Sequence, residues 1–520
     1  MLGKKRWALL PGILLMAAAL TACSSAGAGN VASEEGSPNP AADDGKAKLE
    51  ITLLAPTFKG GGWPDNNHPT IQYLDKKFNI DLKVQWTPGS GYDEKLNVMA
   101  ASGELPDLFI GYEDTFLKWQ SQGVFVDLAP YLKDYPKLAS EFPEDMMNIL
   151  NPPGKIYGFP KYSEPYQASL IVREDWLNNL GLTKPDTSKF TVDEFYRIAK
   201  AFAKDDPDGD GKADTIGFTL GGVTKDTGFD GGETLEAAFG LANGWKEVDG
   251  KLVPKQTQSE EWKAYLNFLA NAYKEGVLDQ DFATNTGDII KEKAGSGKLG
   301  ITAQNFTLIN RTNKQAQAID PKAHFVPIAP PIGPLSLRGN AGQTVGDTKI
   351  VLNAEMSEQK RQRVLKLLNW WITEEGSNVI KDSVEGIMYE KSPDGKVTLT
   401  ERGKKEVDSL PILNNWFFRS SSLKHDIHQW DDPKLTDQFM AFQSELAKYP
   451  WTNPGAPYVV YSQTYIKEAA DLSTKFMATA MNIIVGREPV EDIDGAIAEW
   501  RASGGDTIIK EVNDAYAKYK

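Results

Sequence analysis

The chain has 520 residues, too many for one hydrophobic core, and this length predicts two or three domains. It carries 57 Lys and Arg against 71 Asp and Glu, a formal net charge of −14, which argues against binding to nucleic acid or to an anionic membrane surface. The single cysteine excludes an intramolecular disulfide and every metal site built from several cysteines.

The first 22 residues have the features of a secretory leader. Three basic residues at 4–6 precede an apolar run over residues 7–20 that is too short to span a membrane as a mature helix. The run ends in Leu20-Thr21-Ala22-Cys23, which resembles a bacterial lipobox, whose cysteine is acylated and becomes the first residue of the mature protein. We therefore expect residues 1–22 to be a lipoprotein signal peptide and Cys23 to carry the lipid.

Residues 23–48 are expected to be a flexible tether, because they are small, polar and contain Gly and Pro, with almost nothing to bury. Such a tether would hold a folded body at the extracellular face of the cell membrane.

The body begins with alternating strands and helices. Strands are predicted at residues 49–54, 81–86 and 107–111, and helices at 71–78 and 92–102. This alternation is typical of βαβ units and predicts mainly parallel sheets flanked by helices. The fold class is therefore α/β.

Helix starts are marked more clearly further along the chain. Thr191 and Glu194 form a capping box ahead of an apolar pattern with helical spacing. Ser259 opens a second helix, and Ser357 opens a third that we expect to end at Gly376.

Several short segments occur in a fixed order along the body: Glu104-Leu105-Pro106-Asp107, Tyr157-Gly158-Phe159-Pro160, Gly297-Lys298-Leu299-Gly300-Ile301, residues 353–376, and a closing stretch over residues 483–505. Together with the lipobox they resemble family 1 extracellular solute-binding proteins. The closing stretch is similar to that of a lipoprotein subgroup from Bacillus and Paenibacillus. The resemblance implies a two-lobed fold like that of periplasmic binding proteins, in which a ligand is captured in the cleft for an ABC importer.

That fold implies a hinge with three chain crossings. Pro- and Gly-rich interruptions at residues 151–165, 328–342 and 385–396 fit such crossings. We expect the first lobe to comprise residues 49–162 and 322–390, and the second lobe residues 163–321 and 391–520. Ligand contacts made by both lobes would favour a closed state over an open one.

An acidic loop predicts a structural Ca²⁺ site. The loop fits D-x-D-x-D-G-x-x-D, which can bring carboxylates from positions 1, 3, 5 and 9 to one hard cation. Position 7 contributes a backbone carbonyl, and position 12 is Gly217 where an EF-hand has Glu, so the strong ligand must come from position 9 or from elsewhere. The predicted ligands are Asp206, Asp208, Asp210, the carbonyl of Lys212, and Asp214. Alginate-binding members of the resembled family carry a similar loop, and a solvated acidic turn is the alternative.

A sugar-binding cleft needs apolar aromatic faces for the CH sides of the rings, with carboxylates and amides for the hydroxyls. The chain has 13 Trp, 18 Tyr and 22 Phe. Several polar and aromatic residues follow predicted strands or lie in late loops, where the ligand crevice of an α/β sheet forms. The candidate ligand residues are Trp63, Asp65, Tyr112, Glu113, Tyr162, Asn305, Phe306, Trp416, Arg419, Trp430 and Trp451. For each aromatic residue, ordinary packing is an equal alternative, and Asp107 fits a turn or cap as well as a sugar contact.

We therefore expect a monomeric, membrane-anchored protein that captures an oligosaccharide and delivers it to ABC permease subunits, and not an enzyme. A peptide or another solute could be the ligand of the same fold, although the acidic body disfavours polyanions. A glycoside-active enzyme and a sensor without a permease remain as alternatives. The sequence has no nucleophile elbow, Walker loop or His-Glu-x-x-His motif, and the pair His425 and His428 lacks a third zinc ligand at a clear spacing.

Overall fold

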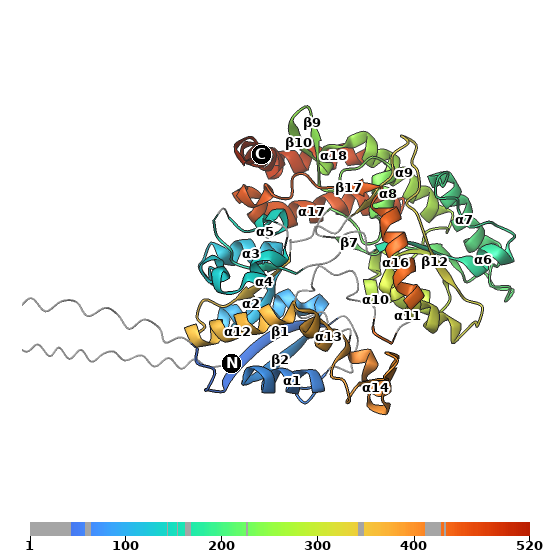
Figure 1. Ribbon diagram of the computed structural model, residues 1–520. Helices are drawn as coiled ribbons and strands as arrows, with labels where there is room; N and C mark the ends of the chain where they lie inside the picture. Colours follow the sequence, from blue (N-terminus) through green and yellow to red (C-terminus); the bar gives the residue numbers. More distant parts are fainter. Residues whose placement is uncertain are drawn as a thin grey trace, which may run out of the picture. The chain divides into compact units, whose positions relative to one another are not determined.

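The structure is a computed structural model that describes residues 43–57, 64–142, 144–152, 154–161, 168–224, 227–341, 348–410, 428–430 and 433–519 (Figure 1). The predicted signal peptide and the lipid site at Cys23 lie outside these residues. Within the described ranges, no helix combines the length and the apolar character needed to cross a bilayer.

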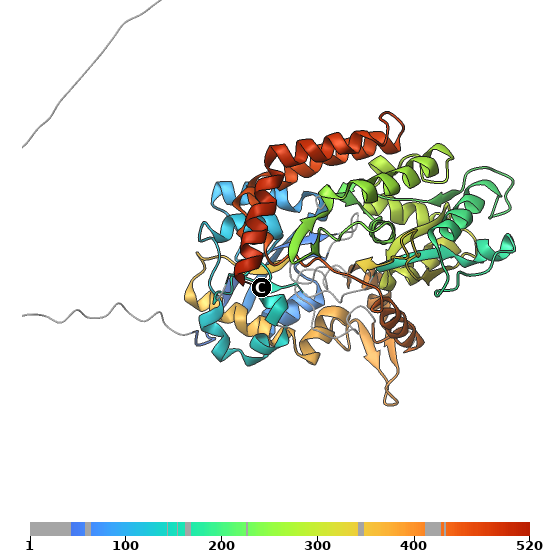
Figure 2. The same ribbon diagram turned by 90° about the horizontal axis from the view of Figure 1, so that it is seen from above.

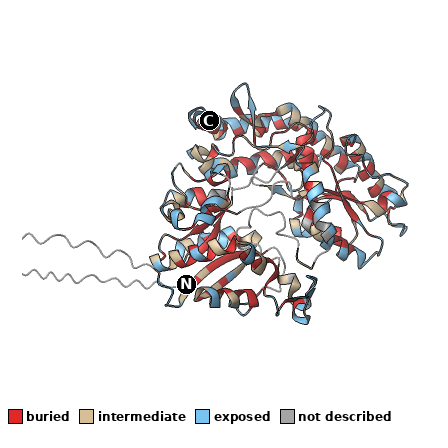
Figure 3. Ribbon diagram, viewed as in Figure 1, coloured by how far each residue is buried: buried red, intermediate tan, exposed pale blue. Residues whose placement is uncertain are grey.

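Two sheets, each with a core of its own, organise the described body. The first has the strand order β2-β1-β3-β14-β4 and the second β12-β5-β11-β6. Both sheets have largely buried strands (Figure 3). The strands of the first sheet are β1 (Leu49–Thr57), β2 (Ile80–Pro88), β3 (Leu108–Gly111), β4 (Phe159–Pro160) and β14 (Lys349–Leu352). Those of the second are β5 (Ala168–Arg173), β6 (Ile216–Phe218), β11 (Leu299–Asn305) and β12 (Phe325–Ile328).

Helices accompany both sheets, and short strand pairs extend from them. With the first sheet belong α1 (Pro69–Phe78), α2 (Tyr92–Ser102), α3 (Glu113–Gln120), α4 (Pro136–Glu141), α5 (Glu144–Asn148), α12 (Glu358–Trp371), α13 (Glu374–Asp382), α14 (Glu401–Glu406) and the hairpin β15 (Tyr389–Lys391) and β16 (Val397–Leu399). With the second belong α6 (Glu174–Asn179), α7 (Val192–Lys204), α8 (Glu233–Ala238), α9 (Ser259–Lys274), α10 (Gly287–Gly295), α11 (Phe306–Gln317) and α16 (Pro433–Leu446).

The C-terminal helices α17 (Gln463–Ile484), α18 (Asp492–Trp500) and α19 (Asp506–Tyr519) complete the second core. Helix α17 packs against α9, α18 and α19, and the three C-terminal helices form the red part of the chain in Figure 2. The remaining pairs are β7 (Val223–Thr224) with β8 (Gly228–Phe229), β9 (Trp245–Val248) with β10 (Lys251–Pro254), and β13 (Asn340–Ala341) with β17 (Pro450–Trp451).

Both sheets are mixed, so the prediction of mainly parallel sheets was wrong. Strand β1 is parallel to β2 and β3, but β14 is antiparallel to β3 and β4. In the second sheet β11 is parallel to β6, while β5 is antiparallel to β11 and β12. The reversed strands, β14 and β5, are those on which the chain enters a sheet from the other lobe. An entering strand starts at the edge where its neighbours end, and it must run the opposite way.

The lobes exchange chain at positions that differ from the predicted boundaries. Residues 322–341 were assigned to the first lobe, but β12 pairs with β5 of the second sheet. Residues 391–410 were assigned to the second lobe, but Val397, Leu399 and Leu410 pack in the first core. The lobe to which each of these segments belongs is determined by strand pairing and packing with residues far away in the sequence. Local composition, from which the boundaries were predicted, does not indicate these contacts.

Local signals were more reliable. The hydroxyl of Thr191 accepts a hydrogen bond from the Glu194 N–H at 3.2 Å, and that of Ser357 accepts one from the Lys360 N–H at 3.3 Å, so both caps are confirmed. The helix after Ser357 ends at Trp371 and not at Gly376. Gly376 lies instead inside α13, where a Cβ would come within 2.2 Å of the Trp370 carbonyl oxygen.

The end of the predicted tether is docked to the body. The Asp43 carboxylate accepts hydrogen bonds from Arg363 Nε at 2.7 Å and Nη2 at 2.6 Å, and from Lys366 Nζ at 3.0 Å. Arg363 Nη1 also donates to the carbonyl oxygens of Phe78 and Asn79 at 2.8 Å. The side chains of Asp43 and Arg363 are each 3% exposed. Residues 43–48 therefore belong to the first lobe, although their composition predicts a free tether.

This buried ion pair predicts a stability effect. The guanidinium of Arg363 holds the pKa of Asp43 well below its usual value of 3.8, so the pair stabilises the fold above that pH and loses its effect as the pH falls below it. Replacing Asp43 by Asn leaves Arg363 buried without a counter-charge, and we expect a loss of about 3 kcal/mol at pH 7. Calorimetric Tm values of D43N and of the exposed neighbour D44N provide the check. Equal Tm values for both variants would contradict the role of the pair.

A buried histidine caps α1. His68 is 4% exposed, its Nδ1 accepts a hydrogen bond from the Thr70 N–H at 3.3 Å, and its buried Nε2 lies 3.8 Å from the Glu406 carboxylate. Burial is the largest influence and lowers the pKa of His68 from 6.5 to about 4. The unfolded chain therefore binds a proton at this residue between these two values, and the folded chain does not.

The first lobe should consequently lose stability as the pH falls from 7 to 5, by about 2 kcal/mol from His68 alone. Asn at position 68 keeps a capping acceptor but cannot titrate. We expect H68N to flatten the dependence of Tm on pH in this range, and H324N, at an exposed histidine, is the control. A wild-type slope in H68N would show that His68 is not the titrating group.

Candidate functional site

Two predicted ligand residues of the first lobe have described side chains. Asp65 is exposed, and its Oδ1 accepts a hydrogen bond from the Asn67 N–H at 2.8 Å. Tyr112 directly follows β3 and packs edge-on against Tyr92, with ring centroids 5.7 Å apart. Glu113 is the first residue of α3, and its side chain lies outside the described part. Asp107 accepts hydrogen bonds from Thr52 and Lys360, which gives it a structural position.

The predicted aromatic residues of the second lobe and of the late segments are engaged in packing. Phe306 directly follows Asn305 at the end of β11, and its ring stacks on Phe442 at 6.1 Å. Trp430 stacks on His428, with centroids 4.7 Å apart, and packs against the first core. The indole N–H of Trp451 donates to the Leu241 carbonyl at 2.9 Å. Each position fits the packing alternative, and a sugar contact at these rings stays a prediction.

Four further predictions fall on residues outside the described ranges. These are Trp63, Tyr162, Trp416 and Arg419.

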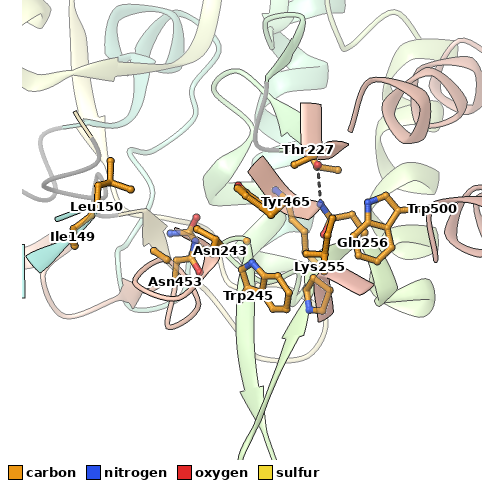
Figure 4. A pocket seen from close by; sticks show the side chains of 16 residues that line it. Ile149, Leu150, Thr227, Asn243, Trp245, Lys255, Gln256, Asn453, Tyr465 and Trp500 are labelled. Carbon is orange, nitrogen blue, oxygen red and sulfur yellow. Dashed lines mark hydrogen bonds between the residues drawn. The ribbon is translucent and has the colours of Figure 1, made fainter. Parts of the chain in front are cut away.

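A pocket of about 130 Å³ lies between the β9–β10 hairpin, the start of α17 and the C-terminal helices (Figure 4). Ile149 and Leu150, from the first lobe, also line it. Two indole rings of the second core, Trp245 and Trp500, each 5% exposed, and the half-buried ring of Tyr465 provide its aromatic lining. None of the predicted ligand residues lines the pocket, although Asn243, which does, donates from Nδ2 to the Trp451 carbonyl at 2.8 Å.

Amides and a hydroxyl supply the polar lining. Gln256 Nε2 donates to Thr227 Oγ1 at 2.9 Å, and Thr227 Oγ1 is also 2.8 Å from Ser473 Oγ. Asn243 and Asn453 add two more amides. Aromatic faces beside convergent amide groups are the combination that holds a polyhydroxylated ring.

Lys255 is the one charged residue among the described lining residues, and it is neutralised. Its Nζ lies 2.9 Å from Glu236 Oε2, with the side chains 5% and 2% exposed. The one charged side chain of the described lining is therefore paired with a carboxylate, which suits an uncharged ligand.

Sequence reasoning missed Trp245 and Trp500. Trp245 follows Asn243-Gly244, and Gly244 has φ +76° at the turn into the hairpin. A Cβ on Gly455 would lie 2.3 Å from the Trp245 ring, so glycine is required for that close approach. The sequence signal that could have indicated Trp245 is the Asn-Gly-Trp turn before a hairpin. Its neighbours in space, more than 200 residues away, were not visible in the sequence.

The acidic loop between α7 and β6 forms as predicted in part. One carboxylate oxygen from each of Asp206, Asp208 and Asp210 lies within 4.8 Å of the others. The Oδ1 atoms of Asp206 and Asp208 are buried and make no hydrogen bond within the described residues. Burial raises the pKa of Asp208, while the hydrogen bond from Lys212 lowers that of Asp210. Orphaned acceptor oxygens around one point fit a hard cation such as Ca²⁺.

Two of the predicted metal residues have other partners. Lys212 Nζ lies 2.8 Å from Asp210 Oδ2, which leaves its carbonyl as the group that was proposed to bind. Asp214 does not lie with the three aspartates, and its Oδ2 is 2.5 Å from Lys298 Nζ.

Comparisons with known proteins agree on one family. Residues 64–378 match the model described as bacterial extracellular solute-binding protein. The chain is 29% identical over 532 residues to lipoprotein LipO of Bacillus subtilis, and 25% identical over 530 residues to the polygalacturonan/rhamnogalacturonan-binding protein YtcQ of the same species. Each alignment covers 99% of both chains.

Solved structures share the fold at low identity. An HMO-binding solute-binding protein from Bifidobacterium longum infantis gives a TM-score of 0.69 at 18% identity, covering 91% of this chain and 99% of the other. The alginate-binding protein AlgQ2, solved without calcium ion, gives 0.68 at 19%, covering 91% and 98%. FusA of Streptococcus pneumoniae, solved with kestose, gives 0.67 at 17%, covering 90% and 99%. These likenesses confirm the two-lobed fold.

The matched family consists of binding proteins, which confirms the expectation that the chain is not an enzyme. The family model covers more than half of the chain, and two relatives align with it from end to end. The protein belongs to the family 1 bacterial extracellular solute-binding proteins.

Proposed function

We propose that the protein captures a neutral oligosaccharide in the pocket lined by Trp245 and Trp500 and delivers it to an ABC importer. The observation that carries the proposal is the lining itself: aromatic faces and amides, with the charge of Lys255 neutralised by Glu236. Because residues from both lobes line the pocket, a ligand there favours the closed state, which is the form we expect an importer to receive.

The names of two relatives support a sugar as the ligand, but the sugars that they name differ in charge. FusA is named as a fructooligosaccharide-binding protein, and YtcQ as one for polygalacturonan and rhamnogalacturonan. The first class of ligand is neutral and the second carries carboxylates. The net charge of −14 and the neutralised pocket favour the neutral class for this chain.

The membrane location is part of the proposal. Acylation of Cys23 would anchor the chain at the outer face of the membrane, and the lipobox in the sequence supports it. The name of the relative LipO, a lipoprotein, supports it as well.

A bound Ca²⁺ is proposed for the loop between α7 and β6. Asp206, Asp208 and Asp210 would hold it, with the Lys212 carbonyl, and the ion would fix this turn of the second lobe. Two solved structures, one of AlgQ2 without calcium ion and one of a FusA EF-hand mutant, support a cation in this family.

The class of ligand is tested by calorimetric titration of the purified protein with neutral oligosaccharides, oligogalacturonates and short peptides. We expect heat of binding with a neutral oligosaccharide, and at least about tenfold weaker binding of the oligogalacturonates, because the described lining residues offer no unpaired cation. Peptide binding without sugar binding would overturn the carbohydrate assignment, and tighter binding of oligogalacturonates would overturn the neutral one.

The pocket itself is tested by W245F and Q256A. Loss of an indole face or of an amide contact should weaken sugar binding by about tenfold or more, which is about 1.4 kcal/mol. W245F should also lower Tm, because Trp245 is buried in the second core, whereas Q256A should change Tm little. W370F is the matched control, since Trp370 packs beside Tyr73 in the first lobe and does not line the pocket. Unchanged affinity in both pocket variants would place the ligand elsewhere.

A further inference from the structure

Two of the four carboxylates of the acidic loop, those of Asp210 and Asp214, form ion pairs with lysines. Lys212 pairs with Asp210 from two residues away, as part of the same turn. Lys298 comes from a different element, 84 residues further along the chain, and its Nζ lies 2.5 Å from Asp214 Oδ2. The other two aspartates, Asp206 and Asp208, each have a buried Oδ1 atom that has no hydrogen-bond partner in the described structure.

The sheet fixes the position of Lys298. It immediately precedes β11, and its carbonyl accepts a hydrogen bond from the N–H of Ile216, the first residue of β6, at 2.8 Å. Asp214 lies two residues before that strand. The parallel pairing of β6 and β11 therefore holds the lysine and the aspartate on adjacent strand starts, and their pairing does not depend on a flexible loop.

A hard cation on this loop would lack ligands while Asp214 stays with Lys298. Ca²⁺ takes six to eight oxygen ligands, and the three grouped aspartates with the Lys212 carbonyl supply only part of that number. Asp214 occupies the ninth loop position, and its carboxylate is half-exposed, with 39% of its side chain accessible. Release of Asp214 from Lys298 breaks one exposed ion pair.

We infer that Lys298 is a built-in competitor of the cation, and that Asp214 exchanges between the Lys298 ammonium and the bound ion. The inference rests on the Ca²⁺ site of the proposed function. An exposed ion pair contributes little, so the competition weakens cation binding by about three- to tenfold and does not abolish it. Together with the missing Glu at Gly217, it puts the affinity in the weak range of extracellular calcium modules, with a Kd of about 10⁻⁴–10⁻³ M.

The test measures Ca²⁺ affinity by calorimetry on the metal-depleted protein. K298M removes the competing ammonium and should tighten Ca²⁺ binding by about three- to tenfold. D214N should weaken it, because the exchanged carboxylate is lost. In the double variant, K298M should have a much smaller effect than in the wild type, since no Asp214 carboxylate remains to be released. K391M is the charge-matched control, an exposed lysine on β15 of the first lobe.

The outcomes separate the inference from the proposals on which it rests. Tighter binding in K298M that disappears in the D214N background supports the exchange. If the wild type binds Ca²⁺ and K298M binds it no more tightly than K391M, the competition is excluded and the cation site stands. If neither the wild type nor K298M binds Ca²⁺, the cation site and the inference both fail, while the sugar titration remains an independent test.

Discussion

A strand that enters a sheet from the other lobe has to start at the edge where its neighbours end. Strands β14 and β5 are the entering strands, and each runs against its neighbours on both sides. The same constraint gathers the loops after β3, β6 and β11 at the edge where the chain changes lobe. Binding residues in this family can therefore come from distant parts of the sequence while the two cores stay separate.

The pocket illustrates this arrangement. Its lining joins Leu150 of the first lobe to Trp245, Tyr465 and Trp500, which come from a hairpin and the C-terminal helices. The buried pair of Lys255 and Glu236 removes the one charge of the described lining. The charge of the described lining is thus paired within an acidic protein, which is the physical basis for proposing a neutral sugar.

Local chemistry made much of the fold predictable from the sequence. The caps at Thr191 and Ser357 depend on neighbours a few residues apart, and both formed. In the acidic turn, which is equally local, three of the four predicted carboxylates lie together. Strand direction, the lobe boundaries, the docking of Asp43 on Arg363 and the Asp214–Lys298 pair depend on partners 84 to 320 residues away or on the route of the chain. A single sequence carries no pattern for such pairings, so the aromatic residues chosen for the cleft did not include Trp245 or Trp500.

A crystal structure of the protein with a bound neutral oligosaccharide tests the central claim most directly. The account predicts a sugar ring packed against Trp245 or Trp500, with amides such as those of Gln256 and Asn453 on its hydroxyls. An oligosaccharide bound elsewhere, with these indoles and amides untouched, would contradict it.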